Sequence, residues 1–165
     1  MRLSHFDGNG RARMVDVAAK RPSRRRAVVE ATVRLSPEAC RALSEQTLAK
    51  GDAFTVAKVA ALQAAKRTDE LIPLCHPLPI EHADVTFEAE PVKGRVRIRA
   101  SVTTTAKTGI EMEAFVAATV GALAIYDMVK AMDPAAAISR VRLISKTGGR
   151  QPYQREPACA QPSSP

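Results

Sequence analysis

The sequence predicts an α+β domain in which helices cover one face of an antiparallel sheet. Two observations carry this prediction. Segments with a period of two residues alternate with segments of helical period, and two strand-like segments follow each other directly, as in a hairpin. The predicted elements run in the order βααββαβ, which is typical of a ferredoxin-like sandwich. With 165 residues, the chain is long enough for one such domain.

The first half of the chain predicts one strand and two helices. Residues 26–36 alternate as a half-buried strand does, although two valines are adjacent. Ser36 and Pro37 predict a helix start, because Ser is a preferred N-cap and Pro fits the first helical position. After a glycine break, Asp52 is expected to cap a second helix, which has a face of alanines and ends near Thr68.

The second half predicts a loop, a hairpin, a long helix and a last strand. Three prolines in LIPLCHPLPI, residues 71–80, exclude regular structure there. Residues 80–90 and 93–107 alternate as two strands joined at a PVKG turn. A long apolar helix is predicted over residues 111–132, and residues 138–145 form the last predicted strand.

We expect three parts along the chain. Residues 1–25 show no sustained period and contain glycines, which indicates a flexible basic arm. Residues 26–150 form the single α+β domain that carries the candidate catalytic residues. Residues 151–165 hold four prolines and no periodicity, so a disordered tail is expected there.

The formal net charge of +8 indicates an anionic partner, either nucleic acid or a phosphorylated metabolite. Five basic residues lie between Lys20 and Arg26, and without them the net charge falls to about +3, so the excess is expected to be local. Phe87 is the only ring in the predicted strands, whereas RNA-binding sheets of this fold stack bases on several aromatic side chains. This weakens an RNA-binding interpretation.

Other features favour a cytoplasmic protein. The longest apolar run, residues 114–126, is shorter than the roughly 18 residues that a membrane span needs, and residues 1–16 lack the apolar core of a signal peptide. The three cysteines are scattered, without a CxxC pair, so neither a disulfide framework nor a zinc site is indicated.

One stripe of the predicted long helix is apolar, with a carboxylate at each end. Glu113 and Asp127 are fourteen residues apart, which is roughly 21 Å along a helix and too far for both to act on one small substrate within one subunit. Two antiparallel copies related by a twofold axis would bring opposite ends together. The stripe therefore predicts an oligomer with its site at the interface.

Asp127 and Lys130 are one helical turn apart, close enough for an acid–base pair. Partial burial would shift both pKa values while each charge supports the other. The alternative is a surface ion pair at a helix end, which is the commoner arrangement.

Three loop segments are further candidates. Cys75 and His76 are adjacent, and adjacent side chains in an extended loop diverge, which argues against a nucleophile pair. His76 alone could bind a phosphate or move a proton, or it could be structural. The glycine-containing segments 107–113 and 145–150 suit an anion, although a helix cap and a turn explain them equally well. GNG at residues 8–10 follows no strand and lacks a third glycine, so dinucleotide binding is discounted.

Six motifs together give the chain a family resemblance over residues 5–150. They are MVDV (14–17), KGD (50–52), AAKRT (64–68), LIPLCHPL (71–78), KTGIEMEA (107–114) and IYDMVKA (125–131). In this order they resemble the cyclic pyranopterin monophosphate synthase family, the molybdenum cofactor biosynthesis protein C family. Ile110 and Val129 depart from the family's common residues, and the basic run at 24–26 is heavier than the family pattern.

The resemblance implies a lyase that converts 3′,8-cyclo-7,8-dihydro-GTP into cyclic pyranopterin monophosphate and diphosphate, with no metal or other cofactor. It places the catalytic Asp at Asp127 and its lysine partner at Lys130. It also implies that a further group of residues binds substrate: Leu74, Cys75, His76, Met112, Glu113, Asp16, Lys20, Lys50, Glu111 and Lys146.

The family is described as a homohexamer, a trimer of dimers with active sites at the dimer interfaces, and the implied partners include neither nucleic acid nor a membrane. From the chemistry we expect Asp127 and Lys130 to exchange protons, and His76, Lys50 and Lys146 to hold the triphosphate. Two alternatives remain open: a basic RNA-binding module, and a catalytically silent scaffold.

Overall fold

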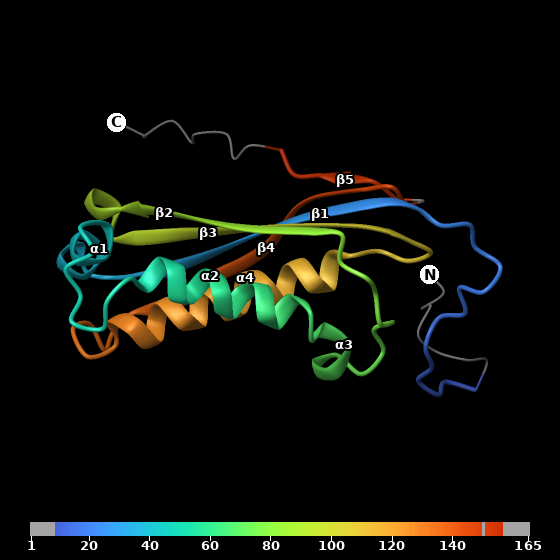
Figure 1. Cartoon of the computed structure of the whole chain (residues 1–165), viewed down its shortest axis with the longest axis horizontal. Coiled ribbons are helices and arrows are strands. Elements are labelled where there is room, and N and C mark those ends of the chain that lie inside the picture. Colours follow the sequence, from blue (N-terminus) through green and yellow to red (C-terminus); the bar gives the residue numbers. More distant parts are fainter. Residues whose placement is uncertain (1–8, 150, 157–165) are drawn as a thin grey trace, which may run out of the picture.

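Five strands form one antiparallel sheet, and helices cover one of its faces (Figure 1). This is a computed structural model, and it describes residues 9–149 and 151–156. The strands are β1 (Ser23–Arg34), β2 (His82–Glu90), β3 (Arg95–Ala106), β4 (Ala137–Thr147) and β5 (Tyr153–Gln154). The helices are α1 (Pro37–Ser44), α2 (Ala53–Ala65), α3 (Thr68–Leu71) and α4 (Glu111–Val129), with a 3₁₀ turn η1 (Pro91–Lys93) between β2 and β3. The predicted α+β class is confirmed.

The strand order is β2-β3-β1-β4-β5, so β1 lies in the middle of the sheet. It pairs along its whole length with β3, from Ser23 opposite Ala106 to Arg34 opposite Arg95, and it pairs with β4 on its other side. The pairing with β4 shifts register twice, once between Val28 and Val29 and once between Thr32 and Val33. At the second shift Thr32 faces Arg140 and Val33 faces Ile138, which leaves Ser139 as an extra, bulged residue.

The helices α1 and α2 begin at the N-cap residues that the sequence predicts. The hydroxyl of Ser36 accepts a hydrogen bond from the Ala39 amide at the start of α1, and the carboxylate of Asp52 accepts one from the Thr55 amide at the start of α2. Gly94 ends the β2–β3 turn with a φ of +54°, a left-handed conformation that glycine adopts without strain.

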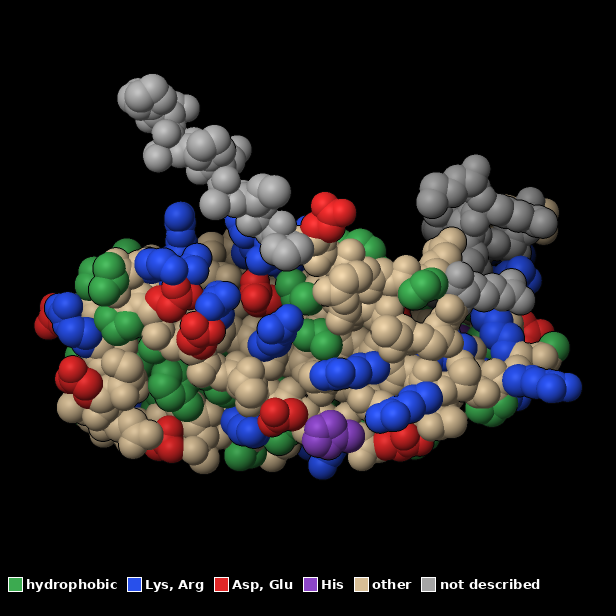
Figure 2. All heavy atoms as spheres, turned by 90° about the horizontal axis from the view of Figure 1, so that it is seen from above, with side chains coloured by type: hydrophobic (Ala, Val, Ile, Leu, Met, Phe, Trp, Pro, Cys, Tyr) green, Lys and Arg blue, Asp and Glu red, His purple; other side chains and the backbone are tan. Residues whose placement is uncertain are grey.

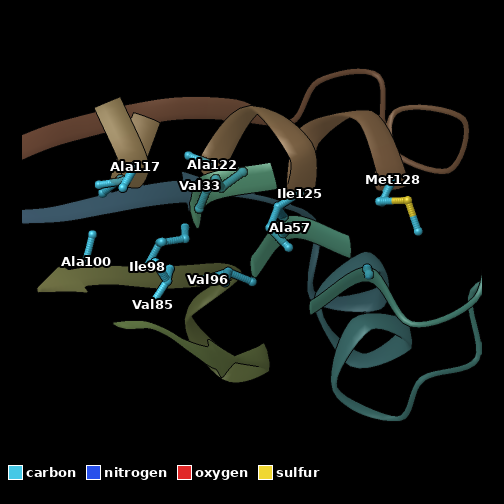
Figure 3. Close-up of a cluster of buried hydrophobic side chains, with 14 of the residues drawn as sticks. Val33, Ala57, Val85, Val96, Ile98, Ala100, Ala117, Ala122, Ile125 and Met128 are labelled. Carbon is cyan, nitrogen blue, oxygen red and sulfur yellow. The ribbon is translucent and has the colours of Figure 1, made fainter. Parts of the chain in front are cut away.

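The core lies between the sheet and the two long helices (Figure 3). Alternate residues of β1, including Val29 and Val33, point inward and are fully buried, as is Ile98 of β3. At Gly121 the helix α4 packs against both α2 and β3, since a β-carbon there would be in van der Waals contact, at 3.4 Å, with the Ala61 β-carbon and a methyl carbon of Ile98. The many alanines of α2 and α4 thus allow a thin, mainly aliphatic core, with Phe54 and Phe87 stacked against its edge.

The structure changes two of the expected boundaries. The strand begins at Ser23, so residues 23–25, which were expected to belong to a flexible arm, are paired with β3. Two residues of the expected tail, Tyr153 and Gln154, form β5 against β4. The rest of the tail from residue 157, and residues 1–8 of the arm, lie outside the described residues.

Candidate active site

A cleft of about 1060 Å³ opens at the end of the sheet where β1 begins and β4 ends. Four segments form its walls: residues 15–26, the proline-rich loop 74–78, the segment 107–113 that leads into α4, and residues 146–149 with Gln151 at the end of β4. The start of α4 lies at this cleft, and its N-cap residue Ile110 makes no side-chain cap, so first-turn amides are left for another acceptor.

The cleft is strongly positive. Its walls hold six basic residues, Lys20, Arg21, Arg25, Arg26, Lys107 and Lys146, against three acidic ones, Asp16, Glu111 and Glu113. Combined with the free amides of a helix start, this charge suits an anion with several phosphate groups.

Two glycines bring the cleft segments together. Gly148 has a φ of +85°, and a β-carbon on it would collide with the carbonyl oxygen of Arg24, so the end of β4 lies tightly against the start of β1. The Ser23 hydroxyl donates to the Gly148 carbonyl oxygen at 2.9 Å and fastens the same contact. At Gly109 the lack of a side chain leaves room for the carboxylate of Glu111, which accepts a hydrogen bond from the Lys146 ammonium at 3.2 Å.

Residues 16–20 are held against the cleft wall by hydrogen bonds between side chains and the backbone of Ala18. The carboxylate of Asp16 accepts from the Ala18 amide at 2.8 Å, and the Lys107 ammonium donates to the Ala18 carbonyl oxygen at 2.8 Å. Asp16 therefore shapes this segment, while the Lys20 side chain has no partner among the described residues and is available to a ligand.

Arg25 is a cleft residue that the sequence reasoning did not select. It lies on the same face of β1 as the buried Ala27 and Val29, so its side chain points to the helix side of the sheet. One guanidinium nitrogen donates to the Lys107 carbonyl oxygen at 3.5 Å, and Nε is buried without a partner. The alternation along β1, continued two residues upstream, could have identified it.

The proline-rich loop brings Leu74, Cys75 and His76 to the cleft as predicted, and Met112 lines it from α4. Burial, reinforced by the charges of Glu113, Asp69 and Glu111, raises the pKa of the Cys75 thiol. Cys75 therefore stays protonated at neutral pH, which agrees with the argument against a Cys–His nucleophile pair.

Glu113 is the buried acid of this cleft. The residue is 4% exposed, and Oε2 of its carboxyl group has no hydrogen-bond partner among the described residues. Burial first of all, and then the charges of Glu111 and Asp69, raise the pKa of Glu113 to about 7. Near neutral pH this group is therefore partly protonated and can both donate and accept a proton.

This buried acid predicts a pH-dependent loss of stability. Between the ordinary glutamate pKa of 4.5 and the raised value of about 7, the folded chain binds more protons than the unfolded chain, so stability falls as pH rises through this window. For the native protein this fall in the free energy of unfolding is expected to reach up to about 3 kcal/mol. Glu113→Gln cannot titrate, so the variant should lack this fall. Urea titrations between pH 4.5 and 8 would measure it, with the exposed Glu70→Gln as control. Parallel curves for native protein and Glu113→Gln would refute the raised pKa.

Asp127 and Lys130 lie at the other end of α4, together with Lys50. The Lys130 ammonium contacts Asp127 Oδ1 at 2.7 Å, and the Lys50 ammonium lies 3.5 Å from Oδ2 and donates to the Asp127 carbonyl oxygen at 2.7 Å. Lys50 was expected to lie with His76 and Lys146, and within one chain it does not.

This Asp127 cluster is exposed to solvent. The side chains of Asp127 and Lys130 are 56% and 52% exposed, not partly buried as expected. The hydrogen bond and charge of Lys130 lower the pKa of Asp127, and those of Asp127 raise the pKa of Lys130. Each shift favours the charged form, so within one chain Asp127 is held as a carboxylate beside the Lys130 ammonium.

The cleft and the Asp127 cluster are separated by most of α4, a distance of roughly 21 Å from Glu113 to Asp127. Three large apolar side chains are exposed on the outer surface of α2 and α4: Leu123 is 54% exposed, Val59 50% and Val56 49%. Large side chains exposed in one patch mark interaction surfaces. Within one chain the cleft and the Asp127 cluster are separate, and we call Leu123, Val59 and Val56 the apolar stripe of α2 and α4.

Two further properties of the described residues concern a metal site and a membrane span. Among the described residues, no group of three or more His, Cys, Asp or Glu side chains could hold a metal ion. The helix α4 is long and apolar enough to span a membrane by composition, but 56% of its most apolar window is buried inside the fold, and core helices of soluble proteins pass the same test.

Comparison with known proteins matches nearly the whole described chain. A family model described as the MoaC family matches residues 14–149. The cyclic pyranopterin monophosphate synthase of Pelotomaculum thermopropionicum is 50% identical over 148 residues, which are 90% of this chain and 87% of that protein. Cyclic pyranopterin monophosphate synthase 3 of Mycobacterium tuberculosis is 49% identical over 162 residues, 98% of this chain and 91% of that protein.

Proposed function

The chain belongs to the MoaC family, a family of molybdenum cofactor biosynthesis, and we propose that it works as a lyase in the cleft at the start of α4. The reaction converts 3′,8-cyclo-7,8-dihydro-GTP into cyclic pyranopterin monophosphate and diphosphate. The observation that carries the proposed location is the excess of basic side chains in a cleft that also holds a buried acid of raised pKa.

The cleft suits the triphosphate end of this substrate. Closing the cyclic phosphate breaks the bond between the α- and β-phosphate groups, so negative charge develops on the departing diphosphate. Lys20, Arg25 and Lys146 can neutralise it, and His76 can orient it by a hydrogen bond. Amides at the start of α4 add further donors.

The proton transfers fall to the Asp127 cluster. The rearrangement opens one ring and closes others with little change of oxidation state, so it depends on repeated proton transfer and we assign it no cofactor. Asp127 is held as a carboxylate and serves as base, while Lys130 is held as an ammonium and serves as acid. Lys50 keeps the carboxylate in place.

A second copy of the chain completes the site. Two copies packed antiparallel through the apolar stripe of α2 and α4 would set the Asp127 cluster of each against the cleft of the other. Such packing also covers Leu123, Val56 and Val59 and withdraws Asp127 and Lys130 from water, where their interaction with substrate strengthens. We propose a trimer of such dimers, located in the cytoplasm.

A turnover assay tests this function. The purified chain, incubated with 3′,8-cyclo-7,8-dihydro-GTP, is expected to release one diphosphate per substrate. His76→Ala should lower kcat/KM by about tenfold or more, because it removes a hydrogen bond to a charged group. The matched control is His82→Ala, which removes an exposed histidine of β2 outside the cleft. No release by the native chain, or equal activity in both variants, would contradict the proposal.

A further inference from the structure

The face of the sheet that the helices leave open is crowded with basic side chains (Figure 2). The register places Arg140 and Arg97 on either side of Thr32, Arg142 and Arg99 on either side of Glu30, and Arg95 beside Arg34. With Lys93, the part of this face around Glu30, Thr32 and Arg34 carries seven cations against Glu30, Glu88 and Glu90. The positive excess of the chain is therefore not confined to residues 20–26.

At one end of this face lies a hollow of about 290 Å³. It is lined by Thr32, Arg34, Lys93, Arg95, Ser139 and Arg140, and none of these is acidic. Arg34 is nine residues from Arg25 along β1, or roughly 30 Å, so the hollow is separate from the cleft. It lies on the opposite face of the sheet from α2 and α4, and it shares no residue with the Asp127 cluster.

The bulge in β4 shapes this hollow. Consecutive residues of a regular strand point to opposite faces, yet Ser139 and Arg140 both line it. This is possible because Ser139 is the extra residue opposite Thr32 and Val33, and the Ser139 hydroxyl donates to the Thr32 carbonyl oxygen at 3.3 Å. Bulges commonly re-aim side chains beside functional sites.

The charges around the hollow are not balanced. The carboxylate of Glu90 accepts hydrogen bonds from Lys93 at 2.6 Å and from Arg95 at 2.9 Å, and it also pairs with Arg97. Arg34 and Arg140 have no acidic partner within residues 9–149 and 151–156. Arg34 lies directly opposite Arg95, and the carboxylate of Glu90, which already pairs with Arg95, makes no ion pair with Arg34.

We propose that this hollow is a second anion site that takes a short oligophosphate, such as diphosphate or triphosphate. Two phosphate groups carry about 1.5 to 2 negative charges each, which matches the unpaired charges of Arg34 and Arg140 together with the surplus of Lys93 and Arg95 over Glu90. The lining of the hollow holds four cations and two hydroxyl side chains but no aromatic or aliphatic residue against which a base could stack, so it suits a phosphate chain better than a nucleobase. The site does not depend on the lyase reaction.

Calorimetric titration with diphosphate tests the proposal. The native chain is expected to bind two diphosphate ions per chain, one in the cleft and one in the hollow. The double variant Arg34→Gln/Arg140→Gln should bind one, with the affinity of the second lowered by about tenfold or more and the lyase kcat/KM unchanged. Arg99→Gln is the matched control, since it removes an exposed arginine of the same face that does not line the hollow. It should keep both sites.

Three results would overturn the proposal. Equal weakening by the double variant and by Arg99→Gln would show a diffuse charge effect, and a single diphosphate per native chain that Arg25→Gln abolishes would leave only the cleft. A changed mass of the double variant in sedimentation velocity would show that copies of the chain meet on this face.

Titration with inorganic phosphate and with a nucleoside triphosphate separates the sources of the ligand. The hollow should bind the nucleoside triphosphate through its phosphate chain, and it should bind inorganic phosphate more weakly than diphosphate. A short RNA that displaces diphosphate from the hollow with a steep salt dependence would also count against an oligophosphate site.

Discussion

Asp127→Asn is expected to lower kcat by about 10²- to 10⁴-fold, the range that general acid–base groups contribute. The amide keeps the size of the side chain and can still contact Lys130, but it cannot accept a proton at neutral pH. Substrate binding rests on the cleft at the other end of α4, so KM should stay within about threefold of the native value. Steady-state measurement of diphosphate release separates the two parameters.

The matched control is Asp84→Asn. Asp84 forms an ion pair with Lys58 at 2.8 Å, and the two side chains are 44% and 45% exposed, similar to the Asp127–Lys130 pair. If the Asp127 pair were only a surface ion pair, both variants would behave alike and turnover would be nearly unchanged. A normal kcat for Asp127→Asn would thus remove Asp127 from the chemistry.

Leu123→Glu is expected to dissociate the oligomer and abolish turnover, although Leu123 belongs neither to the cleft nor to the Asp127 cluster. Its side chain is 54% exposed in the middle of the apolar stripe of α2 and α4. At a twofold interface the substitution acts twice, since it buries two like charges where two apolar groups met. Sedimentation velocity would report the mass and the diphosphate assay the activity.

Val92→Glu serves as the control for this change. Val92 is 99% exposed in the turn η1 between β2 and β3, so a charge there adds the same group at a site away from the stripe. It should leave mass and turnover unchanged. A Leu123→Glu variant that keeps the native mass and the native rate would show that the stripe is not the contact between copies.

Local sequence rules were sufficient for much of the fold. Ser36 and Asp52 begin helices as predicted because an N-cap depends on three or four consecutive residues. Boundaries were less certain: Ser23, Arg24 and Arg25 at the start of β1 were assigned to the arm, because residues 1–25 show no sustained period. The register places these three residues in the sheet all the same, because they pair with β3, whereas the pairing with β4 begins only at Arg26.

The composition of the site was harder to predict because it depends on contacts between distant segments. The family resemblance selected Lys50 and Lys146 together, yet Lys50 lies beside Asp127 while Lys146 contacts Glu111 in the cleft. Periodicity placed Glu113 and Asp127 on one stripe, but it could not tell that Glu113 is buried while Asp127 faces solvent. That difference arises from the loops that fold over the start of α4.

The central claim is that each active site combines the cleft of one copy with the Asp127 cluster of another. The most direct test is to co-express two variants, Asp127→Asn and the cleft variant His76→Ala/Lys146→Ala, each inactive when expressed alone. With random pairing, half of the dimers are mixed and each restores one of its two sites, so the mixture should regain about a quarter of native turnover. A mixture as inactive as its two components, in purified mixed oligomers, would contradict a shared site.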